Sequence, residues 1–170
     1  MIAIVAVDEN WGIGCDGELL FNIPEDMQFF KKMSDGKVVV MGYATLISLP
    51  NSKPLKNRTN IVLTKRDLNI DGVIVCRSID ELLKTAKKYS PDDVIVMGGE
   101  QVYAQLLDYC HKIYVTKIKG MKKADRYFPN VDLLDNWKLA DISEEKEHNG
   151  LKYSFNEYIN TKFKILVKNT

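Results

Sequence analysis

Six short runs of β-branched and other apolar residues recur along this chain of 170 residues, with helical patterns between them. The runs are Ile2–Val7, Lys37–Met41, Asn60–Thr64, Gly72–Cys76, Asp92–Met97 and Lys112–Ile118. They are nearly continuous in Val and Ile, which is typical of strands that are covered on both faces of a parallel sheet. This alternation predicts an α/β fold.

Four segments between the runs carry helix signals. One of them follows Ser78, which forms a capping box with Glu81, and ends before Pro91. The predicted helices are Pro24–Met33, Tyr43–Leu49, a segment from Ser78 to Tyr89, and Glu100–Tyr109.

The end of the chain has a different pattern. Trp137–Glu147 and Leu151–Ile159 flank Asn149-Gly150, a strong signal for a β-hairpin. We therefore expect a three-layer sandwich, with helices on both faces of a mostly parallel mixed sheet of about eight strands and a C-terminal antiparallel hairpin. Residues 1–159 form one domain. The tail 160–170 has no assigned role, and its run Phe163–Val167 is compatible with an extra strand or with a partner contact.

Charge and cysteine usage exclude several classes of protein. The chain has 24 basic and 23 acidic residues, so charge gives no reason to expect a nucleic acid or a membrane as a partner. Cys15, Cys76 and Cys110 lack CxxC spacing, and only His111 and His148 are available as histidine ligands, so we expect neither a disulfide frame nor a metal site. The sequence shows no secretion signal and no long apolar segment, which predicts a cytoplasmic protein.

Asp26 interrupts an apolar helix face. At helical spacing it shares that face with Ile23, Met27, Phe30 and Met33. Desolvation raises the pKa of a carboxyl group in such surroundings, which suits a proton donor near neutral pH. The alternative is an acidic residue that only stabilises the first turn of the helix.

Two strand–glycine–helix junctions, Val38–Gly42 and Val94–Gly99, are suited to phosphate binding. Neither is a GxGxxG fingerprint, so a standard Rossmann site is not indicated. Four basic residues lie at strand ends, where α/β folds bind their ligands: Arg58, Lys65, Arg66 and Arg77. The alternative is that they are ordinary surface residues with no ligand to bind.

Seven short motifs, in this order, resemble the dihydrofolate reductase family over about residues 1–159. They are Ile2–Ala6, Gly12–Leu19, Ile23–Met27, Val40–Thr45, Pro54–Asn60, Val96–Tyr103 and Tyr114–Thr116.

The resemblance implies a reductase that uses NADPH to convert 7,8-dihydrofolate to tetrahydrofolate for one-carbon metabolism. In the family, an acid matching Asp26 helps to deliver a proton to N5, and a threonine matching Thr116 supports that acid. Gly14–Leu19 matches a mobile loop that closes over the nicotinamide, and Arg58 matches the arginine that pairs with the glutamate α-carboxylate of the substrate. The implied catalytic residues are Asp26, Thr116, Phe21 and Leu19. The implied substrate-binding residues are Ile4, Ala6, Asp26, Met27, Phe30, Leu49, Leu55, Arg58, Met97 and Thr116.

The resemblance also implies a cofactor site, in which Thr64, Lys65 and Arg77 hold the 2′-phosphate of NADPH. Its expected partners are the small-molecule substrate and antifolate inhibitors, and the expected state is a monomer. The implied cofactor-binding residues are Ala6, Ile13, Gly14, Gly17, Leu19, Gly42, Tyr43, Ala44, Thr45, Leu63, Thr64, Lys65, Arg77, Met97, Gly98, Gly99, Glu100, Gln101, Val102 and Tyr103.

The chain departs from the family pattern at three places. Leu20-Phe21 stands where Pro-Trp is usual, so the contacts of the lid with substrate and inhibitors should differ. Tyr43-Ala44 replaces a basic pair, and Gln101 replaces a frequent basic residue. The preference for NADPH over NADH should then depend on Lys65, Arg66 and Arg77.

Two other functions remain open at this point. A reductase of the riboflavin pathway has a similar sheet, but the acid of Pro24–Asp26 and the Arg58 loop are features of a folate site. A non-catalytic folate- or nucleotide-binding module would bind both ligands and turn over neither.

Overall fold

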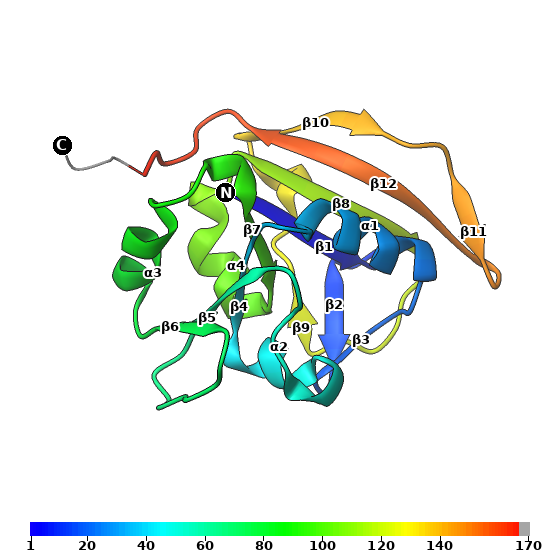
Figure 1. Ribbon diagram of the computed structural model, residues 1–170. Helices are drawn as coiled ribbons and strands as arrows, with labels where there is room; N and C mark the ends of the chain where they lie inside the picture. The colour runs from blue at the N-terminus through cyan, green and yellow to red at the C-terminus, as the bar shows by residue number, and fades with distance from the viewer. Residues whose placement is uncertain (167–170) are drawn as a thin grey trace.

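The structure is a computed structural model that describes residues 1–166. Within them, nine strands form one twisted sheet in the order β10-β12-β8-β1-β7-β4-β5-β6, with β11 paired to β12 (Figure 1). The six predicted runs are the six strands β1 (Ile2–Val7), β4 (Val38–Gly42), β5 (Thr59–Leu63), β6 (Val73–Cys76), β7 (Val94–Gly98) and β8 (Lys112–Lys119). Neighbours among these six pair in parallel, so the predicted fold class is confirmed.

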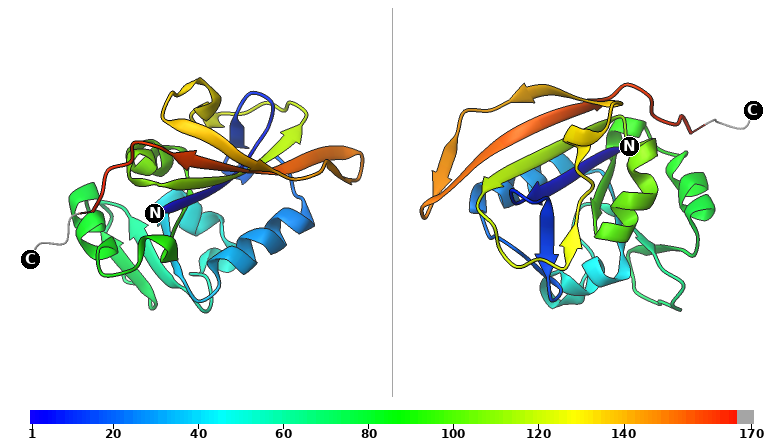
Figure 2. Two further views of the ribbon diagram at one scale, coloured as in Figure 1. Left: turned by 90° about the horizontal axis from the view of Figure 1, so that it is seen from above. Right: turned by 180° about the vertical axis from the view of Figure 1, so that it is seen from behind.

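Alternate residues of each central strand enter two separate apolar clusters, one on each face of the sheet. On one face, Val38 and Val40 pack with residues of α3 (Ile79–Ala86) and α4 (Glu100–Leu106). On the other face, Val39 and Met41 pack with residues of α1 (Pro24–Ser34) and α2 (Tyr43–Ser48). The helices thus cover both faces, which explains why the strands are nearly continuous in Val and Ile (Figures 1 and 2).

The C-terminal hairpin is also present. Asn149 and Gly150 have φ of 49° and 79°, the left-handed values that a two-residue hairpin turn requires. This turn joins β11 (Lys146–His148) to β12 (Leu151–Asn160), which pairs antiparallel with β8.

Three predicted boundaries are wrong. The third helix ends at Ala86, because Lys88 and Tyr89 donate to carbonyls three residues back and tighten the chain into turns. The fourth ends at Leu106 and continues as the short 3₁₀ helix η3 (Leu107–Tyr109). The segment Trp137–Glu147 is not one strand. It splits into β10 (Trp137–Ile142) and β11, because Ser143 Oγ accepts the backbone N–H of Phe155.

A second, three-stranded sheet was not predicted. It has the order β3-β2-β9, from β2 (Gly12–Cys15), β3 (Glu18–Leu19) and β9 (Arg126–Tyr127). Further 3₁₀ turns are η1 (Pro50–Ser52), η2 (Pro91–Asp93) and η4 (Val131–Leu133). None of the helices in residues 1–166 is both long enough and apolar enough to cross a membrane.

The described part of the tail packs on its own chain. The backbone N–H of Lys164 donates to Asp108 O at 2.7 Å, and its ammonium lies 2.9 Å from the carboxylate of Asp108. Phe163 lies over the ring of His111, and Leu166 packs against the core. Residues 167–170, with the end of the predicted apolar run, lie outside the described residues.

Candidate active site

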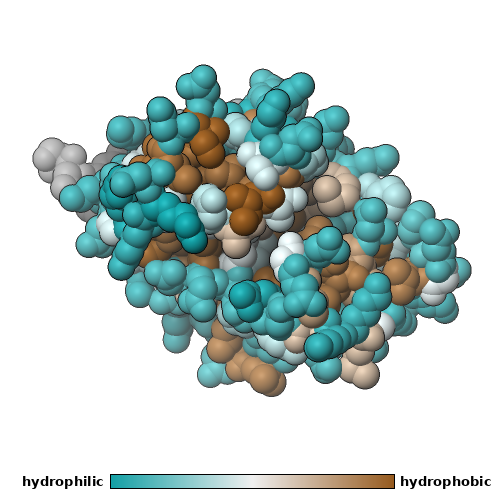
Figure 3. Space-filling model, turned by 90° about the horizontal axis from the view of Figure 1, so that it is seen from below, coloured by the Kyte–Doolittle hydropathy of each residue, from teal (hydrophilic) through white to brown (hydrophobic). Residues whose placement is uncertain are grey.

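Strands β1 and β7 separate after two residue pairs. These strands pair only at Ile2↔Ile95 and Ala3↔Val96, after which β1 follows β8 and β7 follows β4. The carbonyl oxygen of Ile4 accepts instead from the buried hydroxyl of Tyr103, at 2.6 Å. Seen from below, the surface is hollowed near its centre and apolar residues gather around the hollow (Figure 3). Ligands of open α/β sheets bind at such points.

Asp26 lies in the first turn of α1 and reaches the sheet. Its Oδ1 accepts a hydrogen bond from Thr116 Oγ1 on β8, at 2.5 Å. Burial raises the pKa of the Asp26 carboxyl, and the Thr116 bond opposes that rise only in part. The site therefore contains an acid that can be protonated nearer to neutral pH than an ordinary aspartic acid.

Most of the predicted apolar contacts lie together beside this acid. Phe30 of α1 and Leu49 after α2 are partly buried against one cluster, which also includes Met97 of β7. Met27, on the same helix, is 48% exposed. Ala6 packs in a smaller cluster with Phe21. Ile4 and Leu55 complete the set in the first cluster.

Arg58 lies at the far end of α1. Its guanidinium donates to Ser34 Oγ at 3.1 Å, to Lys56 O at 2.8 Å and to Lys31 O at 3.0 Å. A guanidinium has five N–H donors, so one on each terminal nitrogen remains for a ligand. Two parallel donors suit a carboxylate.

Glycines end the two adjacent strands β4 and β7. Gly98 faces Met41 in the register and has φ of 126°, a value that residues with a side chain rarely adopt. A Cβ there would lie 3.3 Å from the ring of Tyr103. Gly42 and Gly99 are the N-caps of α2 and α4, and neither helix start has a side-chain cap. The first-turn N–H groups of both helices are thus free to bind phosphate oxygens.

Five of the predicted cofactor residues follow these glycines or lie beside them. Tyr43, Ala44 and Thr45 form the first turn of α2, and a Cβ on Gly99 would lie 3.6 Å from Thr45 Oγ1. Leu63 ends β5 and Gln101 is exposed on α4.

The basic residues after β5 and β6 gather in one place, but their charges are engaged differently. Arg77 forms an ion pair with Asp67 and donates to Lys65 O at 3.3 Å. Arg66 instead stacks on Tyr43, with Cζ 4.7 Å from the ring centroid. Its backbone N–H donates to Thr64 Oγ1. Arg66 therefore brings a cation to the position where Tyr43 itself offers none.

The loop of Gly14–Leu19 is the β2–β3 hairpin, and β9 holds it from the side. The backbone N–H of Asp16 donates to Asp125 Oδ2 at 3.0 Å, and Asp125 N donates to Gly14 O at 3.0 Å. Gly17, at the tip, has open space around it, and Leu19 is 67% exposed. After the hairpin, the ring of Phe21 lies 4.6 Å from Lys122 Nζ.

Some predicted cofactor residues turn their side chains away from the hollow. Ile13, Val102 and Tyr103 are buried in the core on the face of α3 and α4. Glu100 Oε1 accepts the backbone N–H of Tyr127 at 2.9 Å. From these positions only the main chain is available to a ligand.

Sequence reasoning missed the groups around the acid that come from distant segments. Tyr153 of β12 donates to Glu25, the neighbour of Asp26. Phe29 packs its ring 5.5 Å from that of Tyr114. The alternation of Leu151, Tyr153 and Phe155 predicts a shared face on one strand but not the helix that this face meets.

Comparisons with known proteins agree with this geometry. The model of a family described as dihydrofolate reductase matches residues 1–160. The dihydrofolate reductase of Bacillus subtilis is 36% identical over 158 residues, 91% of each chain. That of Staphylococcus aureus is 33% identical over 162 residues, covering 94% of this chain and 97% of the relative. A solved structure of dihydrofolate reductase from Enterococcus faecalis, complexed with NADP(H) and RAB-propyl, superposes with a TM-score of 0.83 at 32% identity. That superposition covers 94% of this chain and 95% of the other.

Proposed function

This chain belongs to the dihydrofolate reductase family, and from this premise we propose that it reduces 7,8-dihydrofolate to 5,6,7,8-tetrahydrofolate with NADPH. The observation that carries the proposal is the part-buried hydrogen bond between Thr116 and Asp26, in a sheet whose adjacent strands β4 and β7 end in glycines. NADPH, when bound, supplies the hydride that reduces C6 of the substrate.

The residues at the strand ends fit the cofactor. A Cβ at Gly98 or Gly42 would come within 3.3 Å of a neighbouring side chain, so only glycine keeps the main chain open there. The uncapped starts of α2 and α4 offer N–H groups to the pyrophosphate. Lys65, Arg66 and Thr64 would hold the 2′-phosphate.

Asp26 binds and orients the pterin and supplies the proton. Its carboxyl lies in the first turn of α1, and Thr116 holds Oδ1 in place. Because burial favours the neutral form, the group can lend a proton toward N5 and regain it from water. The apolar cluster of Ile4, Phe30 and Met97 excludes water from the rings.

Arg58 and the lid complete the site. The two remaining N–H donors of Arg58 would form a fork to the α-carboxylate of the substrate, at the end of α1 remote from Asp26. The β2–β3 hairpin would close over the nicotinamide, with Leu19 moving from its exposed position. Residues 1–159 form the catalytic domain, and the protein is expected in the cytoplasm. The expected oligomeric state is a monomer, which sedimentation of the purified protein tests.

The direct test is an absorbance assay. Adding dihydrofolate to the protein with NADPH should remove the NADPH absorbance, and an antifolate should block the loss. Tight binding of both ligands without turnover would favour the non-catalytic module. Turnover of a riboflavin-pathway pyrimidine in place of dihydrofolate would favour the other reductase.

A further inference from the structure

Glu25, the residue next to the catalytic acid, joins helix α1 to the C-terminal hairpin. Its Oε2 accepts a hydrogen bond from the hydroxyl of Tyr153 on β12. Its Oε1 lies 3.3 Å from the ammonium of Lys146 on β11. Tyr153 is 3% exposed and packs with Ile118, so its hydroxyl is held in one place and can anchor the helix through Glu25.

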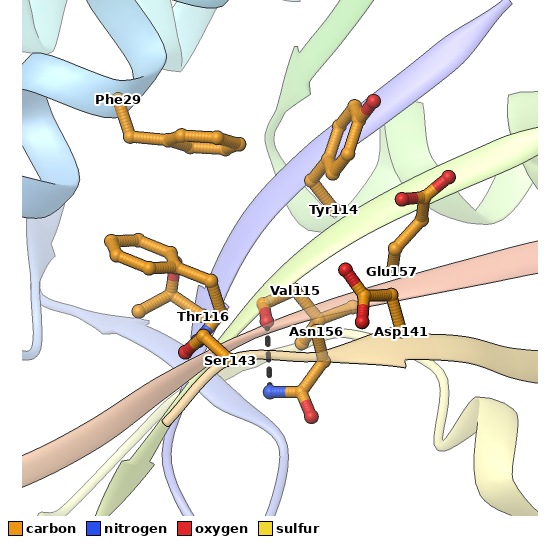
Figure 4. A pocket seen from close by; sticks show the side chains of 9 residues that line it. Phe29, Tyr114, Val115, Thr116, Asp141, Ser143, Asn156 and Glu157 are labelled. Carbon is orange, nitrogen blue, oxygen red and sulfur yellow. Dashed lines mark hydrogen bonds between the residues drawn. The ribbon is translucent and has the colours of Figure 1, made fainter. Parts of the chain in front are cut away.

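Helix α1 needs such an attachment. Its N-cap, Ile23, provides no side-chain hydrogen bond, and of the 11 helical residues only Ser34 is fully buried. A cavity of about 150 Å³ opens beside the helix, lined by Phe29 of α1 and otherwise by residues at the edge of the sheet, such as Tyr114, Thr116 and Glu157 (Figure 4). The helix packs on the sheet through Phe29, Phe30 and Met33, and side-chain hydrogen bonds hold its two ends. Arg58 holds the last turn through the carbonyl of Lys31. In the first turn, Glu25 accepts from Tyr153 and Asp26 accepts from Thr116.

We propose that Tyr153 is a positioning residue for the reduction, which acts through Glu25 to hold the first turn of α1 on the sheet and to keep the carboxyl group of Asp26 out of water. The proposal rests on the function proposed above. No contact between Tyr153 and substrate is required.

The charges around Asp26 favour a positional role over a direct electrostatic one. The titratable or charged groups nearby are Glu25 on α1, Tyr153 on β12, Lys146 on β11 and Tyr103 on α4. Lys146 pairs with Glu25 and so offsets its charge. Burial is the main cause of the raised pKa of Asp26. Burial, followed by Glu25, raises the pKa of Tyr153 to about 12, so its hydroxyl remains a donor at any working pH.

The test is Tyr153→Phe, which keeps the ring and removes the hydroxyl. The first turn should then admit water, and the pKa of Asp26 should fall toward its ordinary value. Because turnover declines as pH rises through that pKa, we expect the decline to move down by ~0.5–1 pH unit, with KM for dihydrofolate changed by less than about twofold. At pH 7 this corresponds to a loss of about three- to tenfold in kcat.

A matched control lies on the same strand. Tyr158 also donates its hydroxyl to a carboxylate, Asp132 Oδ1 at 2.6 Å, but on the opposite face of the sheet. Tyr158→Phe should leave the pH profile of turnover unchanged. If both variants moved the profile equally, the effect would be one of general stability and the proposal would be wrong.

A second variant separates the hydroxyl from the ion pair. Glu25→Gln keeps an oxygen that can accept from Tyr153 but loses the charge that pairs with Lys146. Its pH profile should stay closer to wild type than that of Tyr153→Phe. The reverse order would assign the positioning to Lys146 and overturn the role of Tyr153.

An NMR titration of the free protein makes the result independent of turnover. Carbon-13-labelled aspartate, with the Asp26 signal assigned through Asp26→Asn, reports the pKa of this carboxyl directly. A lowered pKa in Tyr153→Phe supports the positioning even if the protein fails to reduce dihydrofolate, and an unchanged pKa refutes it. Failure of the proposed function would appear instead as absent turnover in wild type.

Discussion

At the scale of single residues, we propose that Asp26 serves the chemistry and weakens the fold. In Asp26→Asn the proton route is lost while the acceptor for Thr116 Oγ1 remains. We expect turnover at neutral pH to fall by roughly 10²–10⁴-fold and to recover in part at lower pH, where solvent supplies the proton. Turnover measured against pH for both forms checks this. An unchanged profile would remove Asp26 from the mechanism.

The same substitution should raise stability. Burial holds the folded-state pKa of Asp26 above its ordinary value, so the folded protein binds the proton more tightly than the unfolded chain. Stability is therefore lost as pH rises through the folded pKa. We expect Asp26→Asn to have the higher Tm at pH 8, with the difference disappearing near pH 4. Thermal unfolding at several pH values measures it, and a gap independent of pH would contradict the linkage.

Arg58→Leu should act mainly on substrate affinity. The lost fork is remote from the hydride transfer and worth roughly 1.5–3 kcal/mol. The variant also releases Lys31 O, so a pterin that lacks the glutamate tail serves as the control ligand. Dihydrofolate should bind more weakly, while this pterin binds as before. Equal weakening of both ligands would make Arg58 a structural residue at the end of α1.

Cofactor preference should depend on cations that are not already neutralised. Arg77 forms an ion pair with Asp67, and this guanidinium lowers the pKa of the Asp67 carboxyl. Arg66 instead stacks on the ring of Tyr43. We expect Lys65→Ala with Arg66→Ala to weaken NADPH binding alone, by about 1 kcal/mol for each exposed cation. NADPH and NADH affinities, measured by fluorescence quenching at two salt concentrations, test this. Arg77→Ala is the matched comparison, and an equal or larger effect there would reassign the phosphate site.

At the scale of elements, we expect the β2–β3 hairpin, the proposed lid, to depend on the hydrogen bond that Asp125 accepts from the Asp16 N–H. Asp125→Ala removes the acceptor for the Asp16 N–H, while Asp125→Asn keeps an oxygen in the same place. A bond of roughly 1 kcal/mol at an exposed site changes the ratio of closed to open lid by about fivefold. We expect faster proteolysis within the β2–β3 hairpin and weaker NADPH binding for Ala but not for Asn. Identical behaviour of the two variants would show that this contact does not hold the lid.

The elements also show what sequence can predict. The parallel strands were recognisable because burial on both faces forces Val and Ile at successive positions. Strands β3 and β9 have two residues each, too short for any period to appear. β3 forms through a local hairpin with β2, whereas β9 forms only because a distant segment meets β2. Asp26 was predicted because it breaks an apolar helix face. The bond from Tyr153 to Glu25 spans 128 residues and leaves no local signal.

At the scale of the whole molecule, the described part of the tail packs near the first residue of the chain. The α-amino group of Met1 lies 3.4 Å from His111 Nδ1, and Phe163 covers that ring. Removing residues 162–170 should lower Tm by about 2–4 °C, since one ion pair and part of a small apolar contact are lost. KM values should not change, because the described contacts of the tail are with Asp108 and His111 and not with the proposed site residues. Calorimetry and steady-state kinetics of the truncated chain check both expectations.

The apolar cluster beside Asp26 is only partly covered by the protein, with Met27 half exposed and Phe30 and Leu49 incompletely buried. A pterin bound there, as we propose, would complete the hydrophobic core that the chain leaves open. By mass action, ligand at a hundred times its Kd adds about 2.7 kcal/mol to the folded state. The lifetime of this protein in the cell should therefore follow the folate supply. An inhibitor that stops turnover would at the same time protect the chain from proteases and raise the amount of enzyme that must be inhibited.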